Sequence, residues 1–296
     1  MSLIAMRIFL DSRDLINLLE GRGPCSVNEF REHLQIGGHE IALSPTVVFE
    51  VAAPLNNPFS KTVVTRLLNE LETLPLAYLA DGQIQWKELV SGIESFATER
   101  EYTPIDPYVG RFDAAIPISG PAPTALYLNH GLAETVFMIW QELPGAVGRQ
   151  PAEWVDRLQS VIAADRDLSS PPGLAHHFRE KLHRDFKMYK IPAPKFPLAE
   201  LADWIYASPS RCPGGRLGYE IFHHLRKNLG DQPEASDFGD FVHVLCIPYV
   251  DLITLDRRMA DYVRRATRGW ADDPSHKIRH DLSSIVKSLN NSELSP

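Results

Sequence analysis

Residues 6–12, which read Met-Arg-Ile-Phe-Leu-Asp-Ser, decide the fold that we expect for this chain. The apolar run from Met6 to Leu10 is interrupted only by Arg7 and ends at the polar pair Asp11-Ser12. A short apolar run that stops at a polar pair is typical of a buried strand leaving its sheet. The spacing of the apolar residues after Asp14 then favours a helix. The chain is therefore predicted to open with a strand followed by a helix.

The same alternation continues along the chain. Residues 41–43 read as a second strand, and Ser44-Pro45 is typical of a helix start, with Ser as N-cap and Pro at the first helical position. Strands alternating with helices imply βαβ units and a largely parallel sheet, so the predicted fold class is α/β. The other strands are expected at 76–79 and 250–253, and the helices of this part at 27–36, 46–53, 62–72, 83–97, 241–247 and 257–266.

A different pattern occupies the middle of the chain. Residues 103–125 are rich in proline and predict an irregular crossing segment. Helical patterns without a convincing strand follow at 133–143, 151–164, 174–189, 197–206 and 217–229, and Gly214-Gly215 reads as a loop. We expect an α/β core formed by residues 1–98 and 236–290, interrupted by a mainly helical insertion over 99–235.

Composition narrows the class of protein. The 296 residues carry a net charge of −8 and are 44% hydrophobic, which is typical of a soluble globular protein and not of a disordered chain, collagen or a coiled coil. The longest uncharged stretch, 114–133, contains prolines and glycines, so we expect no membrane span. No hydrophobic segment of signal-peptide length precedes Arg7, and the three cysteines lie far apart. These features predict a reduced, cytoplasmic protein.

Acidic residues stand where strands are expected to end. Asp11 follows the first strand and Asp256 the last, while Glu50 lies one turn into the helix after the second strand. Ligands of parallel sheets gather outside the carboxyl ends of the strands, so distant segments can converge there. A further set at i, i+3 and i+6 spacing shares one helix face and consists of Asp237, Asp240 and His243.

These acidic residues predict a metal site. Clusters of oxygen ligands hold Mg²⁺ or Mn²⁺, and carboxylates without a counter-ion would repel one another, so a bound cation is their natural counterpart. Each position also has a structural interpretation. Asp11 and Asp256 are suitable helix N-caps, Glu50 is a candidate surface helix residue, and His243 in an apolar helix is typical of a core histidine.

At these residues the chain resembles the PIN domain family, which includes toxin–antitoxin ribonucleases and RNA-processing enzymes. Residues 8–12 look like the family's opening strand that ends in Asp-Thr or Asp-Ser, and Glu50 fits its second acidic position. Residues 237–256 are similar to its closing motif of an Asp-headed helix, a strand and Thr-x-Asp. The match covers residues 6–98 and 236–268. The separation of Glu50 and Asp240 by 190 positions exceeds a compact PIN domain and requires the large insertion.

The resemblance implies a PIN-like three-layer fold and assigns roles to residues. Its metal ligands would be Asp11, Glu50, Asp240 and Asp256, with Asp237 as the alternative to Asp240, and its supporting hydroxyl groups would be Ser12 and Thr254. His243, which is an addition to the family's minimal pattern, is a further supporting candidate. The implied activity is a Mg²⁺- or Mn²⁺-dependent endoribonuclease that leaves 5′-phosphate and 3′-hydroxyl ends. Arg257 and Arg258, directly after Asp256, are candidates for contacts with the phosphate backbone.

Three functions stay open from the sequence. The first is this nuclease, acting on RNA in preference to DNA, with an antitoxin-like protein inhibitor as a further partner and with oligomerisation open. The second is a PIN-like scaffold with a weak or unused acidic pocket, which serves as a protein- or RNA-binding regulatory module. The third is a hydrolase of small phosphorylated molecules. The net charge of −8 argues against a protein that coats nucleic acid non-specifically.

Overall fold

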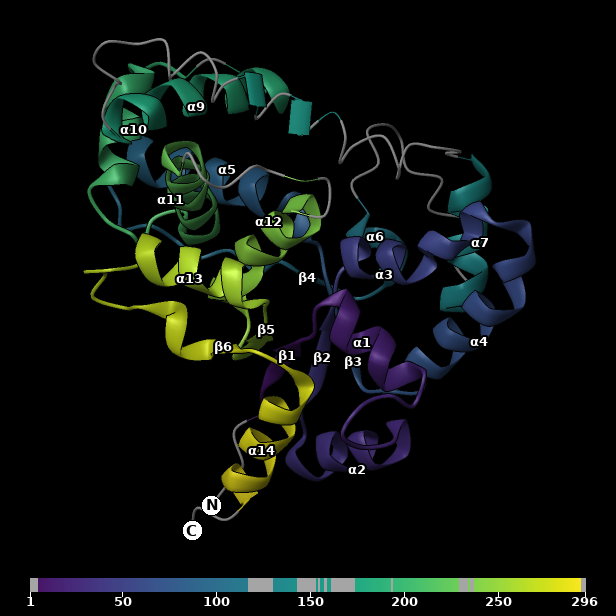
Figure 1. Ribbon diagram of the computed structural model, residues 1–296. Coiled ribbons are helices and arrows are strands. Elements are labelled where there is room, and N and C mark those ends of the chain that lie inside the picture. The colour runs from purple at the N-terminus through teal and green to yellow at the C-terminus, as the bar shows by residue number, and fades with distance from the viewer. Residues whose placement is uncertain are drawn as a thin grey trace.

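A mostly parallel sheet forms the centre of the computed structural model, which describes residues 5–116, 130–142, 153, 155–156, 159–160, 174–192, 194–228, 234 and 237–293 (Figure 1). Six strands lie in the order β4-β3-β2-β1-β5-β6. Strand β4 runs antiparallel to β3, and the other neighbouring pairs are parallel. The predicted α/β class is thus confirmed. The strands are β1 (Arg7–Phe9), β2 (Glu40–Leu43), β3 (Leu76–Leu79), β4 (Tyr108–Val109), β5 (Leu252–Thr254) and β6 (Ile278–Arg279).

Helices flank the sheet in two groups (Figure 1). In one group α1, α3 and α4 pack on one another and α7 packs on α4, and in the other α11 packs on α5, α12 and α13. Helix α14 packs on α2 and on β5 and β6. The helices are α1 (Ser12–Leu19), α2 (Val27–Gly37), α3 (Pro45–Ala52), α4 (Lys61–Leu71), α5 (Ile84–Ala97), α6 (Phe112–Ala115), α7 (Leu132–Glu142), α9 (Leu174–Met188), α10 (Leu198–Tyr206), α11 (Pro213–Lys227), α12 (Asp237–Cys246), α13 (Arg257–Ala266) and α14 (Leu282–Glu293).

Local capping explains where the predicted helices begin. The Ser44 side chain accepts a hydrogen bond from the backbone N–H of Val47 at the start of α3, with Pro45 in the first turn. At the start of α2, Ser26 and Glu29 form a capping box in which each side chain bonds the other residue's backbone N–H. These bonds satisfy backbone donors that a helix leaves unpaired in its first turn.

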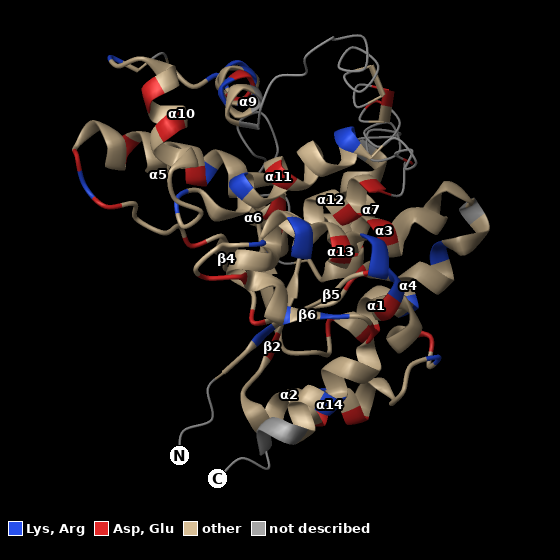
Figure 2. Ribbon diagram, turned by 60° about the vertical axis from the view of Figure 1, so that its left-hand side comes forward, with Lys and Arg blue, Asp and Glu red and all other residues tan. Residues whose placement is uncertain are grey.

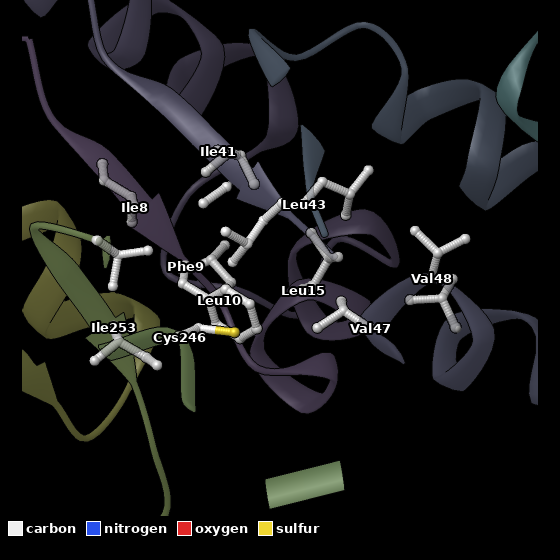
Figure 3. Close-up of a cluster of buried hydrophobic side chains, with 14 of the residues drawn as sticks. Ile8, Phe9, Leu10, Leu15, Ile41, Leu43, Val47, Val48, Cys246 and Ile253 are labelled. Atoms are coloured by element: carbon white, nitrogen blue, oxygen red, sulfur yellow. The ribbon is translucent and has the colours of Figure 1, made fainter. Parts of the chain in front are cut away.

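The main apolar core lies between the strands and both helix groups (Figure 3). Ile8 and Phe9 of β1, Ile41 of β2 and Ile253 of β5 are fully or almost fully buried in it. Leu217, Ile221 and Leu225 of α11 belong to the same cluster, as do residues of α7. Helices α9 and α10 form a second cluster with Leu89 of α5. Part of the segment predicted as an insertion, in α7 and α11, therefore packs into the same apolar core as the sheet. The division of the chain into an α/β core and an insertion stays a prediction.

The start of α11 was predicted wrongly. Gly214 and Gly215, expected in a loop, lie in its first turn, and their backbone N–H groups each donate to the buried Glu88 carboxylate at 2.7 Å. A carboxylate at this position accepts from backbone N–H groups that have no partner within the helix. The partial positive charge at the helix N-terminus also stabilises the negative charge of the carboxylate. The partner lies 126 positions away in the chain, so no local pattern indicates it.

Other elements were not predicted. Strands β4 and β6 have two residues each, which is too short for an apolar period to appear. Helix α14 does carry a helical pattern of Leu282, Ile285 and Leu289, all buried, so its sequence held a usable signal. Most of the helix predicted over 151–164 lies outside the described residues.

In the described part of the chain, no helix is both long enough and apolar enough to cross a membrane. Cys25, Cys212 and Cys246 are all free thiols.

The close packing of α11 against α12 gives a stability test. A Cβ at Gly214 would lie 2.6 Å from the backbone oxygen of Leu245, which cannot move away as a side chain can. Gly214→Ala should therefore lower the free energy of unfolding by about 1–3 kcal/mol, the usual cost of overpacking, despite Ala's better helix propensity. Gly110→Ala, which meets no atom within 4 Å, is the matched control. Urea denaturation measures both, and equal stability of the two variants would contradict the packing described here.

Candidate functional site

The strand order changes direction at β1. Chain order runs from β1 through β2 to β3 on one side, and β5 and β6 lie on the other. In open α/β sheets such a reversal leaves a crevice outside the carboxyl ends of the strands. Asp11 follows β1 and Asp256 follows β5 at this edge, and α3, which follows β2, carries Glu50. The acidic segments of α1, α3 and α12 lie in the same region of the molecule in Figure 2.

Asp11 and Asp256 are the N-caps of α1 and α13. The Asp11 Oδ1 accepts a hydrogen bond from the backbone N–H of Asp14 at 2.8 Å, and the Asp256 Oδ1 accepts one from Met259 at 2.6 Å. The Asp11 backbone N–H donates to the Thr254 Oγ1 at 2.8 Å, which ties the ends of β1 and β5 together. The capping role is therefore present, and in both carboxylates it occupies Oδ1 and leaves Oδ2 for other partners.

Burial and neighbouring negative charges raise the pKa of three of the predicted acidic residues. Burial raises the pKa of Asp11 to about 6, and the charges of Asp14 and Asp256 act in the same direction. Burial also raises the pKa of Glu50 to about 7, with further contributions from Asp240 and Asp11. The pKa of Asp240 rises to about 7 because of burial and the charges of Asp256, Asp11 and Asp237. The fold thus brings these carboxylates close together: the charge of Asp11 disfavours ionisation of Glu50 and Asp240, and the charge of Asp256 disfavours ionisation of Asp11 and Asp240.

Glu50 lies against the backbone of α12. A Cβ at Gly239 would stand 1.9 Å from the Glu50 Oε1, so a side chain at that position would displace the carboxylate. Ser12 donates a side-chain hydrogen bond that lowers the pKa of Glu50 and opposes part of the effect of burial. The other oxygen, Oε2, is buried and has no hydrogen-bond partner among the described residues. Glu50 is therefore a part-buried carboxylate with one oxygen available.

His243 of α12 is a buried, neutral histidine beside Glu50. Its ring packs against Phe9 with the centroids 5.1 Å apart, and burial lowers its pKa to about 3. The Nε2 atom lies 3.7 Å from the Glu50 Oε2, beyond hydrogen-bond distance, and neither ring nitrogen has a hydrogen bond within the described residues. The interpretation as a core histidine agrees with this burial.

Arginine side chains form ion pairs with some of the acidic candidate residues. Arg258 forms a two-point ion pair with the buried Asp237, and the longer contact, from Nη2 to Oδ2, measures 3.1 Å. Arg257 is exposed on the first turn of α13. Arg13, which the sequence did not single out, places its Nη2 3.4 Å from the Asp11 Oδ2 and 3.5 Å from the Asp14 Oδ2.

A further carboxylate at the same edge was missed. Asp81 follows β3, and burial raises its pKa above the ordinary range. It accepts backbone hydrogen bonds from Thr46 at 3.3 Å and from Gly82 at 2.7 Å. The apolar run before it, Leu76–Leu79, follows the pattern that marked Asp11, so the signal was present. Its bonds to the start of α3 give it a structural role beside Glu50.

The described side chains do not form a ready metal centre. Among the residues that the structure describes, no three His, Cys, Asp or Glu side chains are placed to hold one ion. Comparisons of the chain with protein-family models, with curated proteins and with solved structures find no match. The resemblance to PIN domains therefore stays a prediction.

The raised pKa values set a pH dependence of stability. A carboxyl whose pKa is higher in the folded than in the unfolded protein contributes most stability below its unfolded pKa, about 4, and loses it as the pH rises through the folded value. For Asp11, Glu50 and Asp240 the folded values are about 6, about 7 and about 7. Without divalent cations, stability should therefore fall between about pH 4 and pH 8.

Removing one of these charges should relieve the repulsion. We expect Asp240→Asn to raise the free energy of unfolding by about 1–2 kcal/mol at about pH 8 in the presence of a chelator, and to flatten the pH profile. Glu32→Gln removes a charge from an exposed position on α2 and should change neither. Chemical denaturation across the pH range gives both quantities. A destabilised Asp240→Asn with an unaltered slope would show that the acidic residues do not repel one another.

Proposed function

We propose that this protein is a Mg²⁺- or Mn²⁺-dependent nuclease that hydrolyses phosphodiester bonds, with RNA as its substrate. One observation carries the proposal. Four carboxylates from four separate segments, Asp11, Glu50, Asp240 and Asp256, gather at the reversal point of the sheet. Burial raises the pKa of Asp11, Glu50 and Asp240, and charges within the group add to the effect. Nothing in a packed core requires such a concentration of negative charge, whereas a cation would offset it.

The donor set fits a hard divalent ion in its chemistry. All four groups offer carboxylate oxygens, the ligands that Mg²⁺ and Mn²⁺ prefer. The Glu50 Oε2 is buried without a hydrogen bond in the described part of the chain, and capping leaves the Oδ2 atoms of Asp256 and Asp11. The Asp11 Oδ2 lies 3.4 Å from the Arg13 Nη2, which an ion would have to displace. Convergence on one ion requires side-chain rotation, since the described residues hold no three-ligand group as they stand. When bound, such an ion polarises a phosphoryl oxygen and neutralises the charge that develops there.

The residues around the acidic site support the handling of a phosphate backbone. Arg257 is exposed beside Asp256 and is our candidate for contacts with phosphate oxygens. Arg13 is a second candidate because it is half-exposed, although its Nη2 contacts Asp11, Asp14 and the backbone oxygen of His280. Arg258 is engaged with Asp237, which leaves Asp240 as the better candidate for the third acidic position. Thr254 and Ser12 orient Asp11 and Glu50 through hydrogen bonds.

Cleavage of a labelled single-stranded RNA with added Mn²⁺ tests the proposal. We expect cleavage that a chelator stops, with products ending in 5′-phosphate and 3′-hydroxyl. Asp11→Asn and Glu50→Gln should each reduce the rate by on the order of 10²-fold or more, because each removes a charge that holds the ion. Glu32→Gln is the matched control for the loss of a distant carboxylate, and its rate should equal that of the unaltered protein.

Calorimetry with Mn²⁺ separates this function from the binding-module alternative. A nuclease should bind the ion with an affinity that Asp240→Asn weakens. Absence of Mn²⁺ binding at millimolar concentration, together with RNA binding but no cleavage, would instead support a scaffold with an unused pocket. Turnover of phosphomonoesters without RNA cleavage would support a hydrolase of small phosphorylated molecules.

A further inference from the structure

A cavity lies at the opposite end of the strands from the acidic residues. Its volume is about 400 Å³, at the lower end of the range for sites that bind small molecules. Pro248 and Tyr249 precede β5, and Pro274 and Lys277 precede β6, so this cavity stands at the amino ends of these two strands, whereas Asp256 follows the carboxyl end of β5. It is therefore separate from the residues of the proposed nuclease.

Flat and rigid side chains make up most of its walls. Aromatic rings come from three separate segments, at Tyr102, Tyr249 and Trp270. Proline rings fill much of the remaining wall, at Pro104, Pro209, Pro213, Pro248 and Pro274. Proline has no backbone N–H, so these walls offer few hydrogen-bond donors. Rings from several directions are suited to contact the faces and edges of a planar apolar group.

Lys277 supplies the cavity with a part-buried positive charge. Its Nζ donates hydrogen bonds to the backbone oxygens of Ile247 at 3.3 Å and Pro248 at 3.2 Å. An ammonium group has three donors, so one remains. Within the described residues no carboxylate oxygen lies within 4 Å of it, and burial lowers the pKa of this lysine, with Asp251 and Asp272 opposing the effect from a greater distance.

The other polar groups are few and stand near the opening. Asp272 and His276 are exposed, and the Ser208 and Ser210 hydroxyl groups lie 2.8 Å apart and bond each other. A single point charge with one free donor matches a ligand that carries one negative charge. A phosphate dianion would bring a second negative charge, and beside Lys277 no other lysine or arginine is among the described residues that line the cavity to pair with it.

We propose that this cavity binds a small aromatic carboxylate, with its one or two rings between Tyr102, Tyr249 and Trp270 and its carboxylate on the Lys277 ammonium group. The rings gain from leaving water, and the anion pairs with a cation that the described protein leaves without an ion pair.

Calorimetric titration of the full chain tests this site with three probes of one shape. Naphthalene-2-carboxylate should bind, whereas its neutral carboxamide and the cationic naphthylmethylamine should bind about 10-fold more weakly or worse. Lys277→Met should lower the affinity for the carboxylate by about 10- to 100-fold. Lys87→Met is the matched control, because the Lys87 Nζ also donates to a backbone oxygen, that of Asp106 at 3.3 Å, but lies outside the cavity.

A second variant keeps the test decisive if Lys277→Met does not fold. Ala271 is exposed at the cavity wall, so Ala271→Trp should fill the opening without disturbing the core and should abolish binding. The proposal is overturned by any of three results: no binding of the carboxylate at about 1 mM, equal or tighter binding of the amide or amine, or unaltered affinity in Ala271→Trp. None of these results depends on nuclease activity, so a failure of this proposal can be distinguished from a failure of the proposed function.

Discussion

The pairing of β1 with a parallel strand on each side is the constraint on which the rest of the structure depends. β2 holds one side of β1 and β5 the other, although β5 comes from near the end of the chain. The hydrogen bond from the Asp11 backbone N–H to the Thr254 hydroxyl joins residues 243 positions apart at the point where both strands end. Because the strands are parallel, the helices that follow them begin at the same edge of the sheet. Their caps and first turns therefore bring acidic side chains together whatever the length of chain between them.

Local signals account for the parts of the fold that the sequence predicted. β1, β2 and β3 are apolar runs, and α1 and α3 follow them behind an Asp or Ser cap, so strand, cap and helix all indicate the same structure. The start of α11 depends instead on Glu88, a residue of α5, and no pattern within 213–216 shows that the two glycines have a distant carboxylate as acceptor. The two-residue strands β4 and β6 likewise exist only through their neighbours in the sheet.

In the candidate site, too, local sequence indicates some residues, whereas others depend on contacts with distant parts of the chain. Asp11 and Asp256 could be placed at strand ends from sequence because each ends an apolar run. Burial and neighbouring acidic charges raise the pKa of Asp11 and Asp240, while the metal site itself stays a prediction. Their neighbours could not be placed. Gly239 matters because its missing side chain leaves room for Glu50, which belongs to another helix. Arg13 matters because its guanidinium reaches two carboxylates of its own helix start. Both effects arise from contacts in the folded chain, and no periodic pattern in the sequence indicates them.

Two carboxylates one helical turn apart on α12 have opposite surroundings, and this difference bears on how the region can work. Asp237 is buried, and it bonds the Arg258 guanidinium and the backbone N–H of Glu234, so its negative charge is already compensated. Asp240 faces Asp256 and Asp11, and burial raises its pKa to about 7. An incoming cation gains more from the group whose charge is not yet compensated, because binding to Asp237 would first require the loss of its arginine. The ion pair of Asp237 thus anchors α12 to α13, while Asp240 keeps a charge that a cation or a proton must neutralise. If the proposed cation site exists, a cation and a proton would compete for the same oxygens near neutral pH, and cation binding would release protons.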